Sequence, residues 1–109
     1  MSIVRRPSAL EDLVDLADHI ALENIEAAGR FIRAAEEAFH DLDRMPFMGS
    51  PREYRDPGIS GIRMWPIKGF RKHPIFYRPI EDGIEIVRVL YSSRDIAGTF
   101  PKMSKLRAN

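Results

Sequence analysis

Two stretches in the first half of the chain carry apolar residues three and four positions apart, which is the spacing of one face of an α-helix. In the first stretch these positions are Leu10, Leu13, Val14, Ala17, Ile20 and Ala21. In the second they are Ala28, Phe31, Ile32, Ala35, Ala38, Phe39 and Leu42. Ser8 and Glu11 have the spacing of a capping box, and Asn24 is a favourable N-cap for the second helix. The pattern predicts two helices, the first ending near Glu23, that fold back on each other because the link between them is short.

The second half of the chain changes to β-branched and aromatic residues, which favour strands. We expect strands over residues 62–67, in the run Ile75-Phe76-Tyr77 and over residues 84–91. A short strand is also expected at Ile3-Val4, ended by Pro7 because proline cannot donate to a sheet ladder. Between the helices and the strands, residues 45–60 are rich in proline and glycine and are expected to form a loop.

The turn Glu81-Asp82-Gly83 predicts how the last two strands pair. A three-residue hairpin loop with Gly83 as its left-handed residue pairs Ile80 with Ile84, Arg78 with Ile86, Phe76 with Arg88, and Ile75 with Val89. Strand side chains alternate between the two faces of a sheet. One face then receives Ile75, Tyr77, Val87 and Val89, and the other receives Phe76, Arg78, Ile86 and Arg88. We expect the first face to pack against the helices and the second to be an open binding surface.

These elements define an α+β fold, in which an N-terminal strand and a two-helix hairpin pack on a small antiparallel β-sheet as a two-layer sandwich. A chain of 109 residues is expected to be one domain over residues 1–109. Its polar end, residues 99–109, is expected to be a mobile tail.

Composition narrows the class of protein further. The chain has 44% apolar and 30% charged residues, as a folded domain does, and it contains no cysteine. Its three histidines are scattered, so we expect no metal site and no cofactor. No stretch resembles a signal peptide or a membrane span, which predicts a cytoplasmic protein without a membrane partner. Residues 1–61 carry seven basic and twelve acidic residues, whereas residues 62–109 carry ten and four, so the sheet half is basic.

Arginines interleaved with apolar residues make the expected open face the best candidate for function. Such a surface can hold phosphates, stack on bases or receive an acidic amphipathic helix; alternatively, each arginine pairs with an internal acid such as Glu85 or Asp95. The candidate binding residues are Arg63, Phe76, Arg78, Ile86, Arg88, Tyr91 and Arg94. By residue type, Tyr91 has three alternative roles: a proton donor, a platform on which a base stacks, or a half-buried core residue. His73 is not expected to be catalytic, and the carboxylates of the helices, including Asp12, are expected to face solvent. No residue is predicted to be catalytic.

Several segments occur in an order that resembles the ParE toxins of the ParE/RelE toxin–antitoxin superfamily. They are Pro46-Phe47, Gly49, Pro51-Arg52, Gly61-Ile62-Arg63, Ile75-Phe76-Tyr77-Arg78, residues 84–90 and Ser93-Arg94-Asp95-Ile96. The resemblance implies a helical hairpin on an antiparallel sheet, a cognate ParD-like antitoxin that wraps the toxin, and inhibition of DNA gyrase.

Relatives of the RelE branch instead cleave messenger RNA on the ribosome, so the resemblance leaves an enzymatic alternative open. For that chemistry the chain offers cations at Arg63, Arg71, Lys72 and Arg88, together with Tyr91. It lacks a convincing pair of proton-transfer groups. A third possibility is an inactive relative that only binds an antitoxin.

Overall fold

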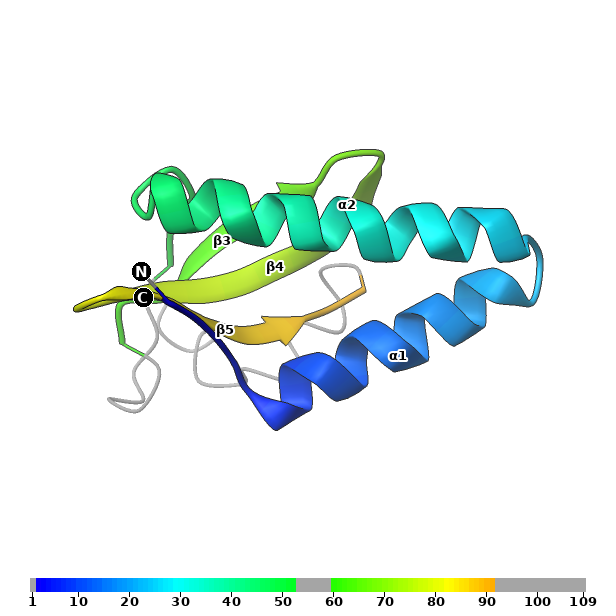
Figure 1. The fold of residues 1–109 in the computed structure, drawn as a ribbon, viewed down its shortest axis with the longest axis horizontal. Coiled ribbons are helices and arrows are strands. Elements are labelled where there is room, and N and C mark those ends of the chain that lie inside the picture. Colours follow the sequence, from blue (N-terminus) through cyan, green and yellow to red (C-terminus); the bar gives the residue numbers. More distant parts are fainter. Residues whose placement is uncertain (1, 53–59, 92–109) are drawn as a thin grey trace, which may run out of the picture.

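A helical hairpin covers one face of a five-stranded sheet in the computed structural model, which describes residues 2–52 and 60–91 (Figure 1). The helices are α1, Pro7–Ala21, and α2, Ile25–Arg44. The strands are β1, Ser2–Arg5; β2, Ser50–Pro51; β3, Arg63–Ile67; β4, Phe70–Ile80; and β5, Gly83–Val89. The expected tail, residues 99–109, lies outside the described residues.

The strands lie in the order β1-β5-β4-β3-β2. The meander β3-β4-β5 is antiparallel, as predicted, and β2 continues it antiparallel to β3. At the other edge β1 pairs with β5 in parallel, so the sheet is mixed rather than wholly antiparallel. The α+β fold, the N-terminal strand and the helical hairpin are confirmed, whereas β2 and the direction of β1 were not predicted.

The two helices begin by different means. The Asn24 side-chain oxygen accepts a hydrogen bond from the Ala27 N–H at 3.0 Å, which confirms the predicted cap of α2. The predicted capping box of α1 is wrong, because the helix already begins at Pro7, whose fixed φ suits the first helical position. The Ser8 hydroxyl donates instead to the Val87 carbonyl at 3.4 Å, which ties α1 to β5.

The main core lies between the helices and the sheet. Phe31 and Phe39 of α2 are fully buried there, because their spacing puts both on the face turned to the strands. The sheet contributes Ile67, Ile75, Tyr77, Ile84, Ile86 and Val89. A smaller cluster of Ile62, Phe76, Val87 and Leu90 is buried on the other face. Both faces of the sheet therefore carry packed apolar side chains.

The pairing of β4 with β5 contains a bulge that the predicted register lacked. Phe76 pairs with Arg88 as predicted, but Tyr77 pairs with Ile86, so Val87 is an extra residue on β5. The two predicted pairs nearer the turn are wrong by one residue, since Arg78 pairs with Glu85 and Ile80 with Gly83. Because one residue of slip turns a side chain to the opposite face, Ile86 joins the main core and Val87 joins the cluster around Phe76.

The hairpin turn is shorter than predicted. Gly83 is not a loop residue but begins β5, so the turn consists of Glu81 and Asp82. Gly83 has φ 153°, and a Cβ there would lie 1.8 Å from the Ser2 carbonyl oxygen. Glycine is required at this position because β1 passes so close to it.

Neither helix in the described part of the chain is long and apolar enough to cross a membrane. Over the same residues, no three histidine or carboxylate side chains are grouped as they would be to hold a metal ion.

Candidate functional site

The sheet face that was expected to be open contains a charged triad around Glu85. The Arg78 Nε donates to one Glu85 oxygen at 2.6 Å, and the Arg6 Nε donates to the other at 2.8 Å. The hydrogen bond from Arg6, helped by that from Arg78, lowers the pKa of Glu85 although partial burial opposes the shift. The alternative in which Arg78 pairs with Glu85 is therefore confirmed, and this pairing holds the end of β4 to β5.

Arg88 is held by α1 rather than presented to a partner. Its Nε and one terminal nitrogen donate to the two Asp12 oxygens at 2.6 and 2.8 Å, and the Val89 N–H also donates to Asp12 at 3.0 Å. This pair raises the pKa of Arg88. The expectation that Asp12 merely faces solvent is wrong. Its carboxylate accepts hydrogen bonds from the last two residues of β5, beyond the point where β1 stops pairing with that strand.

Arg63 and Tyr77 together hold the segment between α2 and β2. The buried Tyr77 hydroxyl donates to the Pro46 carbonyl and accepts from the Gly49 N–H, each at 2.8 Å. Arg63 donates to the carbonyls of Phe47 at 3.1 Å and Gly49 at 2.6 Å. Burial raises the pKa of Tyr77, which keeps the hydroxyl protonated as a donor.

Gly49 is required at this contact. A Cβ on Gly49 would lie 2.6 Å from the Tyr77 hydroxyl oxygen and 2.9 Å from the Met64 carbonyl oxygen. The segment therefore passes too close to β3 and β4 for any other residue, and this close passage fixes the position of Phe47 at the surface.

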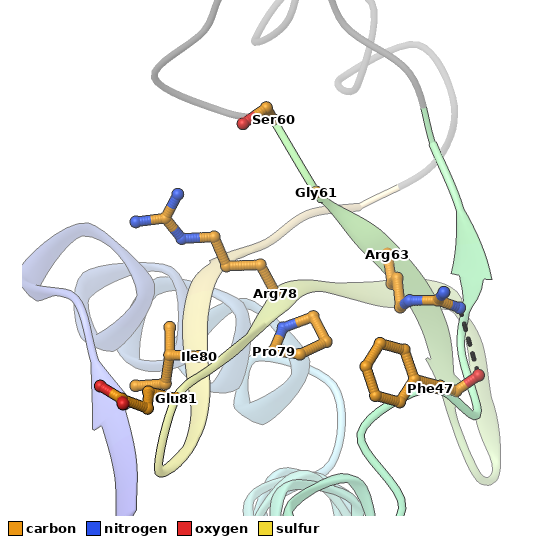
Figure 2. Close-up of a pocket in the computed structure, with 8 residues that line it drawn as sticks. All are labelled: Phe47, Ser60, Gly61, Arg63, Arg78, Pro79, Ile80 and Glu81. Atoms are coloured by element: carbon orange, nitrogen blue, oxygen red, sulfur yellow. Dashed lines mark hydrogen bonds between the residues drawn. The ribbon is translucent and has the colours of Figure 1, made fainter.

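An open pocket of about 650 Å³ lies beside Phe47, and we call it the Phe47 pocket. Its lining residues are Phe47, Ser60, Gly61, Arg63, Arg78, Pro79, Ile80 and Glu81. In Figure 2 the Phe47 ring lies near Pro79 and Arg63, while the Arg78 side chain extends away on the opposite side. The Phe47 side chain is 71% exposed, and the Arg63 guanidinium lies 5.0 Å from the centre of its ring. The structure thus brings together Arg63 and Arg78, two of the predicted binding residues.

The other predicted binding residues lie elsewhere. Phe76 is buried, and the prediction that Ile86 shares its face is wrong because of the bulge. Tyr91 is 46% exposed at the far end of β5, where its ring centre lies 5.0 Å from that of His73. Arg94 lies outside the described residues.

His73 is enclosed by aromatic rings. Its ring centre lies 5.2 Å from that of Phe31 and 6.1 Å from that of Phe70. Its buried Nδ1 has no hydrogen-bond partner, and burial lowers the pKa of the imidazole. His73 is thus a neutral, partly buried side chain in an aromatic cluster.

The residues that sequence reasoning missed at this site are Asp12, Tyr77 and Phe47. The partners of Asp12 and Tyr77 lie far away in the sequence, so no local spacing signals either contact. Phe47 had a usable signal, because it is a large apolar residue next to Pro46 in a segment with no apolar periodicity.

The order of the strands and the face that the helices cover define the class of fold: a small α+β domain in which a helical hairpin follows an edge strand and packs on an antiparallel meander. Residues 3–96 match the family described as the ParE toxin of the type II toxin–antitoxin system parDE. The chain therefore belongs to the ParE toxin family.

Solved structures agree with this assignment at the level of the fold. One is the chromosomal ParDE toxin–antitoxin system from P. aeruginosa, with a TM-score of 0.67 and 22% identity over 85% of this chain and 97% of that chain. Another is the heterotetrameric YoeB–YefM toxin–antitoxin complex from Staphylococcus aureus, with a TM-score of 0.53 and 17% identity over 84% of this chain and 95% of that chain. No curated protein sequence matches the chain significantly.

Proposed function

We propose that this protein is the toxin of a type II toxin–antitoxin pair and arrests growth by binding DNA gyrase, until a cognate ParD-like antitoxin neutralises it. Membership of the ParE family supports the toxin role. The solved relatives are toxin–antitoxin complexes, which supports an antitoxin partner. The pair would act in the cytoplasm, where gyrase is found.

The observation that carries the choice of a binding inhibitor is that three of the candidate arginines, Arg63, Arg78 and Arg88, are held by groups of the protein itself. Arg88 is bound by Asp12, Arg78 by Glu85, and Arg63 by two backbone carbonyls. A ribonuclease needs cations whose donors already point at the charge developing on phosphorus, together with placed proton donors and acceptors. Arginines held in this way instead shape a fixed surface, which is what a binding inhibitor requires.

The Phe47 pocket is the part of that surface which we assign to a protein partner. An exposed aromatic side chain flanked by arginines is typical of residues that dominate binding energy at interfaces. Of the predicted binding residues, Arg63 and Arg78 retain this role in the proposal. Phe76 and Ile86 are buried in different clusters, and neither lines the pocket, so neither has a binding role in the proposal.

The test compares two targets with the same purified full chain. Supercoiling by gyrase should be inhibited, and messenger RNA on programmed ribosomes should remain intact. Adding the antitoxin encoded beside the gene should restore supercoiling. Cleavage of messenger RNA without any effect on gyrase would overturn the proposal in favour of a RelE-like endoribonuclease, and no effect in either assay would indicate an inactive relative.

One observation favours the endoribonuclease as the second candidate. His73 and Tyr91 lie in ring contact beside Arg71 and Lys72, and an imidazole next to a phenol is a possible proton-transfer pair. If the protein cleaves messenger RNA, Tyr91→Phe should abolish cleavage while the protein stays folded. Cleavage that survives this substitution would exclude Tyr91 from the chemistry.

A further inference from the structure

The lysines and arginines without a partner in the described part of the chain gather around the first half of α2 and the start of β4. Among the described residues, seven arginines donate to an acid, a carbonyl or a sulfur atom: Arg5, Arg6, Arg44, Arg52, Arg63, Arg78 and Arg88. The described residues Arg30, Arg33, Lys68, Arg71 and Lys72 have no such bond, and all five are exposed. Arg30 and Arg33 belong to the first half of α2. Lys68 belongs to the turn between β3 and β4, and Arg71 and Lys72 belong to the start of β4. The first half of α2 and this turn lie side by side (Figure 1).

Three of these cations line one groove of about 570 Å³, which we call the α2 groove. Its lining residues are Ala27, Arg30, Arg33, Ala34 and Glu37 from α2, Lys68 and Gly69 from the turn, and Phe70 at the start of β4. Arg71 and Lys72 follow directly in the chain. The groove is therefore positive on both walls, and Glu37 is its one acidic lining residue.

Acids are available to these arginines but do not pair with them. Glu26 and Glu37 stand four residues from Arg30 and Arg33 along α2, at a spacing that favours ion pairs on a helix. Neither pair closes to ion-pair distance in the described structure. The Arg33 guanidinium lies back along the helix over Gly29, 3.5 Å from where a Cβ would stand there. Both arginines thus keep their donors available to an external anion.

From this we propose that the α2 groove binds the phosphate backbone of a nucleic acid. Arginine presents donors that match phosphate, and several unpaired cations along a groove fit a polyanion with many regularly repeated charges. A protein partner would need apolar anchors, but the groove offers only Ala27, Ala34 and the partly buried Phe70. The large exposed apolar side chains, such as Phe47 and Leu22, line no part of it.

The proposal does not depend on gyrase being the target. It concerns a surface separate from the Phe47 pocket, with no lining residue in common. Gyrase inhibition and nucleic-acid binding can therefore fail independently.

The test measures binding of the full chain to a short, fluorescein-labelled DNA duplex by anisotropy over a series of salt concentrations. The variant Arg30→Gln with Lys68→Gln removes one cation from each wall, and Arg44→Gln with Arg52→Gln removes the same charge elsewhere. The slope of log affinity against log salt should fall in magnitude by about 2 in the groove variant, because each phosphate contact contributes about 0.9. It should not change in the control variant.

Three results would overturn the proposal. Equal slopes for the wild type and the groove variant would remove the groove from the interface. An equal loss in the control would mean that only net charge matters. Binding of poly-glutamate without binding of DNA would indicate an acidic protein segment instead. Thermal unfolding checks that each variant is folded, and Lys68→Gln alone, in an exposed turn, provides a second variant with an expected slope change of about 1.

Discussion

At the scale of single residues, half-buried charges hold the ends of the sheet in place. Glu85 accepts from Arg6, which follows β1, and from Arg78 on β4, so one carboxylate joins three strands. Asp12 of α1 accepts from Arg88 and from the Val89 N–H, so it joins this helix to the last residues of β5. Removing either carboxylate leaves a guanidinium without its partner, which costs more than the net value of the bond.

Glu85 should make stability depend on pH in the acid range. Because its pKa is lowered in the folded protein, its contribution is complete above the unfolded pKa of about 4.3 and is lost as the pH falls through the folded pKa. In urea unfolding, Glu85→Gln should be less stable than the wild type at neutral pH, and the difference should shrink on acidification. A difference that stays constant with pH would contradict this account of the triad.

Asp12→Ala should destabilise the protein by about 1–3 kcal/mol, because it leaves Arg88 and the Val89 N–H without their acceptor. Asp15→Ala is the matched control, since Asp15 is an exposed acid one turn later on the same helix; it should change stability by no more than about 0.5 kcal/mol. Chemical unfolding measures both. Equal effects would mean that the Asp12 contacts contribute nothing to stability.

At the scale of elements, apolar periodicity was sufficient to predict both helices and the three-stranded meander, because each buries a continuous stripe or face. It was not sufficient for the register of the last hairpin. The extra residue at Val87 lies just past the β5 residues that pair with β1, and its carbonyl accepts from Ser8 of α1; no local sequence pattern records either contact. The same limit applies to the candidate site: Arg63 and Arg78 could be proposed from residue type, but Arg63 pairs with the core residue Tyr77. The contact that places Phe47 also depends on Tyr77, thirty residues away in the sequence.

Gly83→Ala should weaken the attachment of β1 to the sheet, because the added Cβ would overlap the Ser2 carbonyl. Backbone amides of β1 should exchange with deuterium faster than in the wild type, while those of α2 are less affected. Gly29→Ala is the control: its Cβ meets only ordinary contact, and alanine favours a helix by about 1 kcal/mol over glycine. Unchanged exchange in β1 would show that the strand can shift without cost.

At the scale of the whole molecule, the two candidate surfaces differ in chemistry. The Phe47 pocket combines an exposed aromatic ring with arginines that are already bound, which suits a shaped protein partner. The α2 groove combines unpaired cations with small side chains, which suits a polyanion. Each surface is held by the same core, so changes at one should leave the other intact.

The most direct test of the account is the inhibition of gyrase supercoiling by the full chain, titrated beside Phe47→Ala and Met45→Ala. Both residues are exposed apolar side chains of one segment, but only Phe47 lines the pocket. The wild type and Met45→Ala should inhibit equally, and Phe47→Ala should need a concentration about tenfold or more higher. Equal inhibition by all three would remove the Phe47 pocket from the interface. No inhibition by the wild type, with messenger RNA cleaved on ribosomes, would contradict the account as a whole.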